Sequence, residues 1–295
     1  MAARRIDIVL VELGHFSTRE KAQRAIMAGC VYLGTELVTK PSRTIRPAED
    51  PLIRVRMKDH AVSRAYYKLQ KALDCFGVVV NSRPAIDVGS STGGFTQLLL
   101  ERGASHVWAV DCGTNQLDWS LRNDPRVIVM EKTNARYLER SDLVQAFTRR
   151  AGVEPGRLPD LAVMDVSFIS LGLIVPVLVN ALAIPELVAL VKPQFEAGRA
   201  EVGSGGIVRD PRTHRSVIAR VVADAAGLGL GLSGLTWSPI AGGDGNIEFL
   251  VHFVAGCCGP EDAARLIDEV VDEAHQRLAC PAGEDHGANA HQAGL

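Results

Sequence analysis

Residues 84–95 read PAIDVGSSTGGF, and this stretch decides the fold class. It begins as a short apolar strand that reaches Asp87, and it continues as a loop with three glycines before a helix over 95–100. Glycines let the chain turn tightly and let a ligand approach the backbone. The N-terminus of the following helix offers unpaired N–H groups to the same space. The pattern therefore predicts a nucleotide-type site at the first strand-to-helix turn of an α/β domain.

The spacing of these glycines argues against a dinucleotide site and against a phosphate-binding P-loop. It differs from the G-x-G-x-x-G pattern of dinucleotide sites, and no Lys-Ser/Thr pair follows it as in a phosphate-binding P-loop. Asp87 at the strand end disfavours a phosphate but suits a ligand that carries an amino-acid group. Asp111 closes a second predicted strand, 24 residues after Asp87, where a carboxylate can bind ribose hydroxyls. These features favour S-adenosylmethionine over the alternative, a purely structural turn.

Charge is distributed unevenly along the 295 residues, a length that predicts about two domains. The net charge is −2, and 47% of the residues are hydrophobic, which is ample for a globular core. Residues 1–71 contain 14 Lys or Arg against 7 Asp or Glu, whereas the remainder contains 18 against 27. A basic N-terminal module on a mildly acidic body predicts an anionic partner for that module. The alternative is an ordinary solvated surface.

The cysteine pattern and the N-terminal sequence lead to expectations about metal binding and cellular location. The six cysteines form no C-x-x-C pair and have no cluster of histidines nearby, so no metal site is expected. No secretory signal is apparent at the N-terminus, and we therefore expect reduced thiols and a cytoplasmic location.

One apolar run is long enough to span a membrane. Residues 169–191 contain a single charge, Glu186, but prolines 176 and 185 interrupt the run. We interpret it as a buried helix over about 172–183 and a buried strand over 187–191 rather than a membrane span.

The basic N-terminal segment has its own pattern of elements. It predicts a helix over 6–13, a capping box at 17–20 that starts a second helix, and two short strands over 31–38. Residues 4–56 resemble the S4 RNA-binding domain, on the strength of STREKAQ at 17–23, AGCVY at 28–32 and Lys40-Pro41. The resemblance implies that this module binds structured RNA through its shape and phosphates. The alternative is a small structural cap. The predicted RNA-binding residues are Arg5, Arg19, Lys21, Arg24, Lys40, Arg43 and Arg64.

From residue 84 onward, predicted strands and helices alternate, which is typical of a mostly parallel sheet with helices on both faces. The predicted strands are 85–88, 106–111, 126–130, 161–165, 187–191 and 247–254. The predicted helices are 64–76, 94–102, 114–121, 143–151, 172–183, 212–227 and 260–278. Residues 227–231 and 238–245 are expected to be flexible turns. The expected boundaries are an N-terminal domain at 4–60, an α/β domain at 63–256, a C-terminal helix at 257–279 and a disordered tail at 280–295.

Four polar residues are candidates for chemistry. In open α/β sheets the site lies beyond the carboxyl ends of the strands, where Asp165 and Lys192 each terminate an apolar run. Glu248 starts the last strand, and Lys68 lies on the helix before the first. This set suits methyl transfer to a ribose 2′-hydroxyl, because the hydroxyl needs a proton acceptor and a desolvated lysine can supply one. We expect Lys192 nearest the 2′-oxygen. Each residue also has an alternative role in a surface ion pair.

The same motifs resemble the TlyA family of ribosomal RNA cytidine-2′-O-methyltransferases, also called haemolysins, over about residues 4–255. The resemblance rests on DVGSSTGGFT, VDCGTNQL, NAR, MDVSFISL, LVKPQFE and GNIEF. It implies a Rossmann-like methyltransferase domain behind an S4 domain, and a catalytic tetrad shared with FtsJ-type enzymes, which maps to Lys68, Asp165, Lys192 and Glu248. It also implies S-adenosylmethionine binding by the region 131–134 and by Asp87, Gly89, Ser90, Ser91, Thr92, Gly93, Gly94, Phe95, Asp111, Asn134 and Asp165.

The family's substrates are cytidines in 16S or 23S ribosomal RNA, so 30S or 50S subunits are the expected partners. The C-terminal helix resembles that of members which act on both subunits. The segment 58–62, KDHAV, departs from the Arg-Ala-Trp-Val type of linker in some members, which leaves any linker-based coupling of RNA binding to cofactor affinity open. Three alternatives remain at this point: a non-enzymatic RNA-binding assembly factor, a membrane-lytic protein and, more distantly, a dehydrogenase. The sequence does not indicate an oligomeric state.

Overall fold

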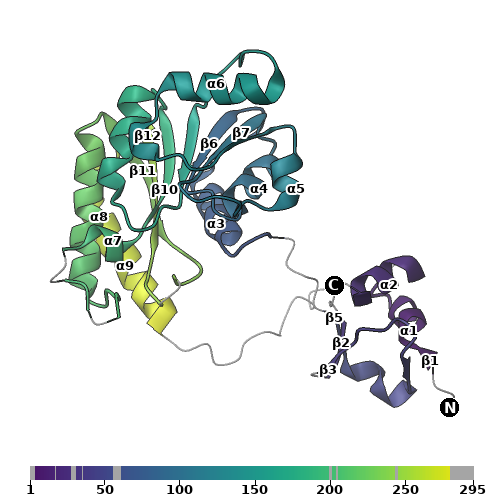
Figure 1. Cartoon of the computed structure of the whole chain (residues 1–295). Helices are drawn as coiled ribbons and strands as arrows, with labels where there is room; N and C mark the ends of the chain where they lie inside the picture. Colours follow the sequence, from purple (N-terminus) through teal and green to yellow (C-terminus); the bar gives the residue numbers. More distant parts are fainter. Residues whose placement is uncertain are drawn as a thin grey trace, which may run out of the picture. The chain divides into compact units, whose positions relative to one another are not determined.

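The structure is a computed structural model, and it describes residues 4–16, 18–27, 31–34, 36–55, 61–198, 201–203, 205–242 and 245–279. The chain separates into two compact units, Met1–His60 and Ala61–Leu295 (Figure 1). The predicted capping serine at 17, most of the 58–62 linker and the tail at 280–295 lie outside the described residues.

The N-terminal unit is a small α+β fold. Two helices, α1 (Ile6–Glu12) and α2 (Arg19–Met27), pack over short strands. One sheet has the order β3-β2-β5, and a second pairs β1 with β4. The bounds are β1 Arg4–Arg5, β2 Val31–Leu33, β3 Glu36–Leu37, β4 Thr44–Ile45, the 3-10 helix η1 Pro47–Leu52 and β5 Ile53–Val55. Apolar side chains that recur at helical spacing on α1 and α2 fill one core with Val31 and Ile53. The predicted helices and hairpin are confirmed.

The larger unit is built on a seven-stranded sheet with the order β11-β12-β10-β9-β6-β7-β8 (Figure 1). Strands β8, β7, β6, β9 and β10 run parallel, and β12 is antiparallel to both of its neighbours. The bounds are β6 Pro84–Val88, β7 His106–Val110, β8 Val127–Met130, β9 Leu161–Met164, β10 Glu186–Val191, β11 Leu230–Trp237 and β12 Phe249–Ala255. The predicted parallel-rich sheet is confirmed.

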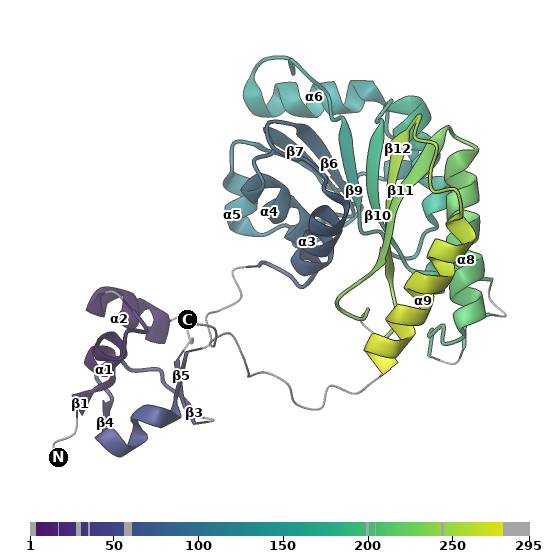
Figure 2. The same ribbon diagram turned by 180° about the vertical axis from the view of Figure 1, so that it is seen from behind.

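Helices cover both faces of this sheet (Figure 2). The helices are α3 Ala65–Phe76, α4 Gly94–Glu101, α5 Trp119–Asn123, α6 Arg140–Ala151, α7 Pro193–Glu196, α8 Pro211–Ala226 and α9 Ala263–Ala279, with a short 3-10 turn η2 at Ala135–Tyr137. Successive side chains of a strand point to opposite faces. Ile86 and Val88 therefore join one core with α6, α8 and α9, whereas Ala85 joins the other with α3 and α4.

The prediction of a flexible turn at 227–231 is wrong in its second half, because strand β11 begins at Leu230 and was not expected. Glycine is required in this strand because segments distant in the sequence pack closely against it. A Cβ on Gly231 would lie 2.0 Å from the carbonyl oxygen of Cys257, and one on Gly234 would lie 2.4 Å from the ring of Phe76. Glycine inside a strand often marks such a close approach, but the local sequence reads as a turn.

The predicted helix over 172–183 is confirmed only in part, because the segment is helical without forming one regular α-helix. The segment forms a 3-10 turn, η3 (Leu171–Leu173), and a π-helical turn, η4 (Val177–Ala181), before β10. Pro176 lacks an N–H group and cannot continue a regular helix from the preceding turn. Of the helices that the structure describes, none combines the length and the apolar character needed to cross a membrane.

Two boundaries differ from the prediction. Helix α5 starts at Trp119 instead of 114, because the side chain of Asp118 accepts a hydrogen bond from the Ser120 N–H and caps the helix there. Glu248 precedes β12, which begins at Phe249, so it lies in a loop instead of in the strand.

Candidate active site

The candidate site lies at the carboxyl edge of the parallel strands. Asp165 follows β9, and Lys192 follows β10. Together with Lys68 of α3 they line a cavity of about 290 Å³. Its other walls come from the start of α3, the glycine loop after β6, the first turn of α4 and the segment after β9. These residues are Ser63, Arg64, Ala65, Gly89, Ser90, Ser91, Thr92, Phe95 and Ser167.

Two ion pairs organise the charged groups. The Nζ of Lys192 lies 2.7 Å from Oδ1 of Asp165 and donates a hydrogen bond of 2.8 Å to Oγ of Ser167. The Nζ of Lys68 donates a 2.5 Å hydrogen bond to Oε2 of Glu248, with both side chains buried. The structure therefore brings three of the four predicted residues to one cavity, and Glu248 lies behind Lys68 without lining that cavity.

A second cavity of about 410 Å³ adjoins the first. The two share Gly89, Ser91, Asp165 and Ser167 as lining residues. Asp111, at the end of β7, lines the second cavity and accepts hydrogen bonds from the N–H groups of Ser91 at 2.8 Å and Gly113 at 2.7 Å. Because Asp165 contributes to both walls, a ligand in one cavity and a ligand in the other would meet beside its carboxylate.

The glycines of the loop allow close packing. Gly89 has φ +84°, and a Cβ there would lie 2.5 Å from the backbone oxygen of Asp165. A Cβ on Gly94 would lie 2.3 Å from Oγ of Ser63 at the start of α3. Glycine at these positions therefore lets β6 approach Asp165 and lets α4 approach α3. Among the predicted cofactor residues, Gly93 and Gly94 pack against helices and line neither cavity.

Asp87 lies beneath the loop instead of in a cavity wall. Its side chain is fully buried, accepts a 2.6 Å hydrogen bond from Oγ1 of Thr96 and leaves Oδ1 without a partner in the described part of the chain. Burial raises the pKa of Asp87 to about 7, and the negative charges of Asp165 and Asp111 add to the shift. An ionised carboxylate at this place therefore requires a compensating positive group.

Asn134 and Phe168 complete the second cavity. Phe168 was not identified from the sequence. Its side chain is 90% exposed, its φ is +63°, and its ring centroid lies 4.9 Å from that of Phe195. A positive φ is unusual for an aromatic residue, and an exposed ring at a cavity mouth is available for stacking. The one sequence signal is its place three residues after the strand-end Asp165.

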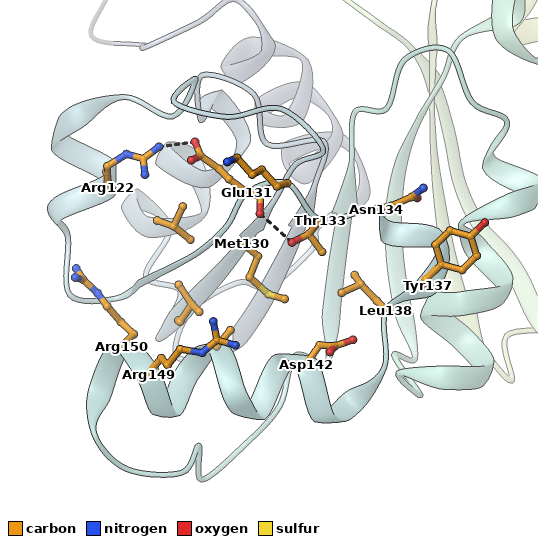
Figure 3. Close-up of a pocket in the computed structure, with 14 residues that line it drawn as sticks. Arg122, Met130, Glu131, Thr133, Asn134, Tyr137, Leu138, Asp142, Arg149 and Arg150 are labelled. Atoms are coloured by element: carbon orange, nitrogen blue, oxygen red, sulfur yellow. Dashed lines mark hydrogen bonds and ion pairs between the residues drawn. The ribbon is translucent and has the colours of Figure 1, made fainter.

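A third cavity, at about 670 Å³ larger than the two described above, lies away from the ion pairs, between β8 and α6 (Figure 3). Thr133 and Asn134 line this cavity as well as the second one, whereas Glu131 lines only the 670 Å³ cavity and pairs with Arg122. Of the predicted cofactor region 131–134, therefore, only Thr133 and Asn134 line the second cavity, whereas all four residues line the 670 Å³ cavity.

The predicted RNA-binding residues fall on both units. Arg5 donates two hydrogen bonds of 3.0 Å to the buried Asp7, and Arg19 donates another of 3.0 Å. Arg43 pairs with Glu36 and lines a cavity of about 400 Å³ with Lys40. The side chains at 21 and 24 lie outside the described residues.

Arg64 belongs to the larger unit, where it lines the 290 Å³ cavity. Within the described residues, no three His, Cys, Asp or Glu side chains gather as metal ligands.

Comparison with known proteins identifies both units. Residues 61–255 match the FtsJ-like methyltransferase family, and residues 4–50 match the S4 domain. The chain is 48% identical to Bacillus subtilis YqxC, provisionally named an rRNA methyltransferase, over 93% of this chain and 95% of YqxC. It is 41% identical to the Mycobacterium tuberculosis 16S/23S rRNA (cytidine-2′-O)-methyltransferase TlyA, over 84% of this chain and 88% of TlyA.

A solved structure points the same way. A Streptococcus thermophilus protein, provisionally called a hemolysin, superposes with a TM-score of 0.69 at 43% identity, covering 95% of this chain and 98% of that one. The resemblance drawn from the sequence motifs is confirmed. The chain belongs to the FtsJ-like methyltransferase family and has an S4 domain at its N-terminal end.

Proposed function

We propose that this methyltransferase transfers the methyl group of S-adenosylmethionine to the ribose 2′-hydroxyl of a cytidine in ribosomal RNA. The observation that carries the proposal is the Lys192–Asp165 ion pair, because Asp165 forms part of the wall between two adjoining cavities. The names of the relatives YqxC and TlyA support RNA as the substrate class.

The second cavity fits the cofactor. Asp111 offers a carboxylate that backbone N–H groups already orient, which suits ribose hydroxyls. Oδ1 of the buried Asp87 has no hydrogen-bond partner among the described residues, which supports a positively charged ligand nearby. When bound, S-adenosylmethionine supplies an electrophilic methyl group and carries positive charge. Gly89, Ser91 and Asn134 would hold it from the loop ends of β6 and β8.

The residues of the 290 Å³ cavity would act on the RNA. The 2′-hydroxyl is a weak nucleophile until a base takes its proton. We assign that role to the neutral amine of Lys192. It forms when the ammonium, which Asp165 holds at 2.7 Å and Ser167 at 2.8 Å, first gives a proton to water. Lys68, fixed from behind by Glu248, would hold the ribose against the glycine loop. Arg64 at the cavity wall would contact the phosphate beside the target nucleotide.

The S4 unit would dock the folded RNA. Asp7 holds the guanidinium groups of Arg5 and Arg19 at the surface, where the side chains remain 39% and 51% exposed. Lys40 and Arg43 would also contact the RNA, and Lys21 and Arg24 are proposed as further contacts from the sequence alone. We propose cytidines of 16S or 23S rRNA as targets, presented by 30S or 50S subunits in the cytoplasm.

Tritiated methyl transfer to isolated 30S and 50S subunits from an unmethylated strain tests this function. We expect incorporation with the wild type, retained S-adenosylmethionine binding but at least about a hundredfold slower transfer with Lys192→Ala, and wild-type transfer with Arg265→Ala. Arg265 is an exposed residue of α9 that pairs with Glu269, so it controls for the loss of a positive charge.

The outcomes separate the alternatives. Wild-type protein that binds rRNA and cofactor but adds no methyl group to either subunit would refute the enzymatic proposal and favour an assembly factor. Lysis of erythrocytes by wild type and Lys192→Ala alike would support the membrane-lytic alternative instead.

A further inference from the structure

The groove between β8 and α6 is larger than either cavity of the candidate active site, at about 670 Å³. Strand β8 is the edge strand of the sheet, so one side of its backbone is not covered by another strand. The floor of the groove is apolar and includes Ile128, Met130, Leu138 and Ala146. Its rim is charged, and the rim residues come from α5, the loop after β8, and α6 (Figure 3).

The rim has a surplus of positive charge. Arg122, Lys132, Arg149 and Arg150 line the groove, against Glu131 and Asp142. Glu131 pairs with Arg122, and Arg150 donates a 3.0 Å hydrogen bond to the backbone oxygen of Asp124. Among the described residues, neither Arg149 nor Lys132 has a carboxylate partner within 4.0 Å. Positive charges that outnumber the nearby carboxylates repel one another and favour an anionic ligand.

The position of these arginines is not explained by their helix alone. Arg149 and Arg150 are in the last turn of α6, where the helix dipole favours cations. Figure 3 shows both side chains reaching from α6 toward the β8 side of the groove, where Arg122 comes from α5. The residues after 71 carry nine more acidic than basic residues. A basic groove on this acidic body is therefore a local reversal of charge.

The shape of the groove favours a polymer. Helix α6 has 12 residues, which corresponds to a length of about 18 Å. At the opposite end from the arginines lies Tyr137 (Figure 3), whose side chain is 71% exposed. The guanidinium of Arg136 lies 5.7 Å from its ring centroid. Nucleic acid binds to such combinations, with phosphates on the cations and a base on the aromatic ring.

We propose that this groove binds the phosphodiester backbone of a second rRNA segment, separate from the nucleotide that enters the 290 Å³ cavity. This inference rests on the proposed function for the identity of the RNA. Thr133 and Asn134 line both the groove and the candidate cofactor cavity, so the second segment would pass close to the mouth of the cofactor site. Arg149, Arg150 and Lys132 would contact phosphates, and Tyr137 would stack on a base.

Equilibrium binding of the full chain to naked 16S and 23S rRNA and to 30S and 50S subunits, between 50 and about 200 mM salt, tests the groove. The test variant is Arg149→Ala/Arg150→Ala. The matched control is Arg265→Ala/Arg277→Ala on α9, which removes the same charge from two exposed residues of the same unit. Binding is measured without methyl transfer, and S-adenosylmethionine affinity is measured in parallel.

We expect the groove variant to bind the preferred RNA about tenfold to a hundredfold more weakly and to lower the slope of log K against log salt by about two. The control keeps the wild-type slope to within about half a unit, and cofactor affinity stays unchanged in both. Equal binding and slopes in the groove variant and the control would overturn the proposal. A loss confined to assembled subunits would also overturn it, because it would indicate a ribosomal protein as the ligand.

The two proposals fail separately. If the wild type methylates rRNA and the groove variant binds RNA as tightly as the wild type, the proposed function stands and the groove proposal is refuted. If the wild type never methylates rRNA but the groove variant binds RNA more weakly, the groove proposal stands and the proposed function is refuted.

Discussion

Removal of Lys68 should destabilise the larger unit strongly, because it leaves a buried carboxylate alone. Lys68 is 9% exposed and Glu248 is 2% exposed, and their charged atoms lie 2.5 Å apart. Water therefore has little access to Glu248 when its partner is removed. Breaking one side of a buried pair typically costs about 3–5 kcal/mol, whereas neutralising both sides costs much less. We expect Lys68→Met to lose about 3–5 kcal/mol and Lys68→Met/Glu248→Gln to recover most of that loss.

Urea unfolding of the full chain measures this free energy. All three tryptophans, Trp108, Trp119 and Trp237, lie in the larger unit, so their fluorescence follows that unit alone. An unchanged m-value would show that the variants unfold from equally compact states. The double variant should remain slow in methyl transfer although its stability is restored. This result would separate the contribution of the ion pair to stability from the contribution of Lys68 to methyl transfer.

Two results would refute this reasoning. Lys68→Met that costs less than about 1 kcal/mol would mean that Glu248 finds water or another partner, contrary to its burial. A double variant as unstable as Lys68→Met would mean that the loss comes from side-chain packing and not from an uncompensated charge.

Three further predictions concern other residues. Asp87→Asn should stabilise the cofactor-free protein at pH 8 by a few kcal/mol. The pKa of Asp87 is about 7 in the folded protein and about 4 in the unfolded chain, so the wild type loses stability as the pH rises from about 4 to 7. Thermal melting of both proteins from pH 5 to 8 checks this, and Tm values of wild type and variant that change in parallel with pH would contradict it. Asp7→Asn should raise the KM for rRNA about tenfold with kcat unchanged, since Arg5 and Arg19 lose the negative charge and one of the two oxygens that accept their hydrogen bonds. Phe168→Ala should lower kcat/KM for rRNA about 5- to 100-fold while Phe168→Tyr retains it, as expected for base stacking and checked by steady-state kinetics.

The strand-end residues could be predicted from the sequence because one general rule places them. Parallel strands present their carboxyl ends at one edge, so Asp165 and Lys192 had to approach each other wherever the helices lay. The glycine loop followed from the same rule, because it comes directly after β6. The apolar strands were recognisable as continuous runs, since both faces of the sheet are covered.

Other features depended on contacts between distant segments. Lys68 and Glu248 are 180 residues apart, and nothing in the local sequence of either fixes their pairing. Strand β11 escaped prediction because residues 227–231 resemble a flexible turn, although Gly231 makes room for Cys257 and Gly234 makes room for Phe76. The positive φ of Phe168 and the hollow beside β8 likewise follow from packing, which no short-range pattern records.

The two ion pairs differ in a way that supports the proposal of Lys192, instead of Lys68, as the proton acceptor. The two lysine side chains are equally exposed, at 11%, so burial does not distinguish them. Their partners do: Asp165 lines both the candidate cofactor cavity and the 290 Å³ cavity, whereas Glu248 lines neither. Methyl transfer requires the proton acceptor at the junction between the methyl donor and the acceptor hydroxyl. Lys192 is held at that junction, and Lys68 is held from behind, in a position suited to fixing the ribose.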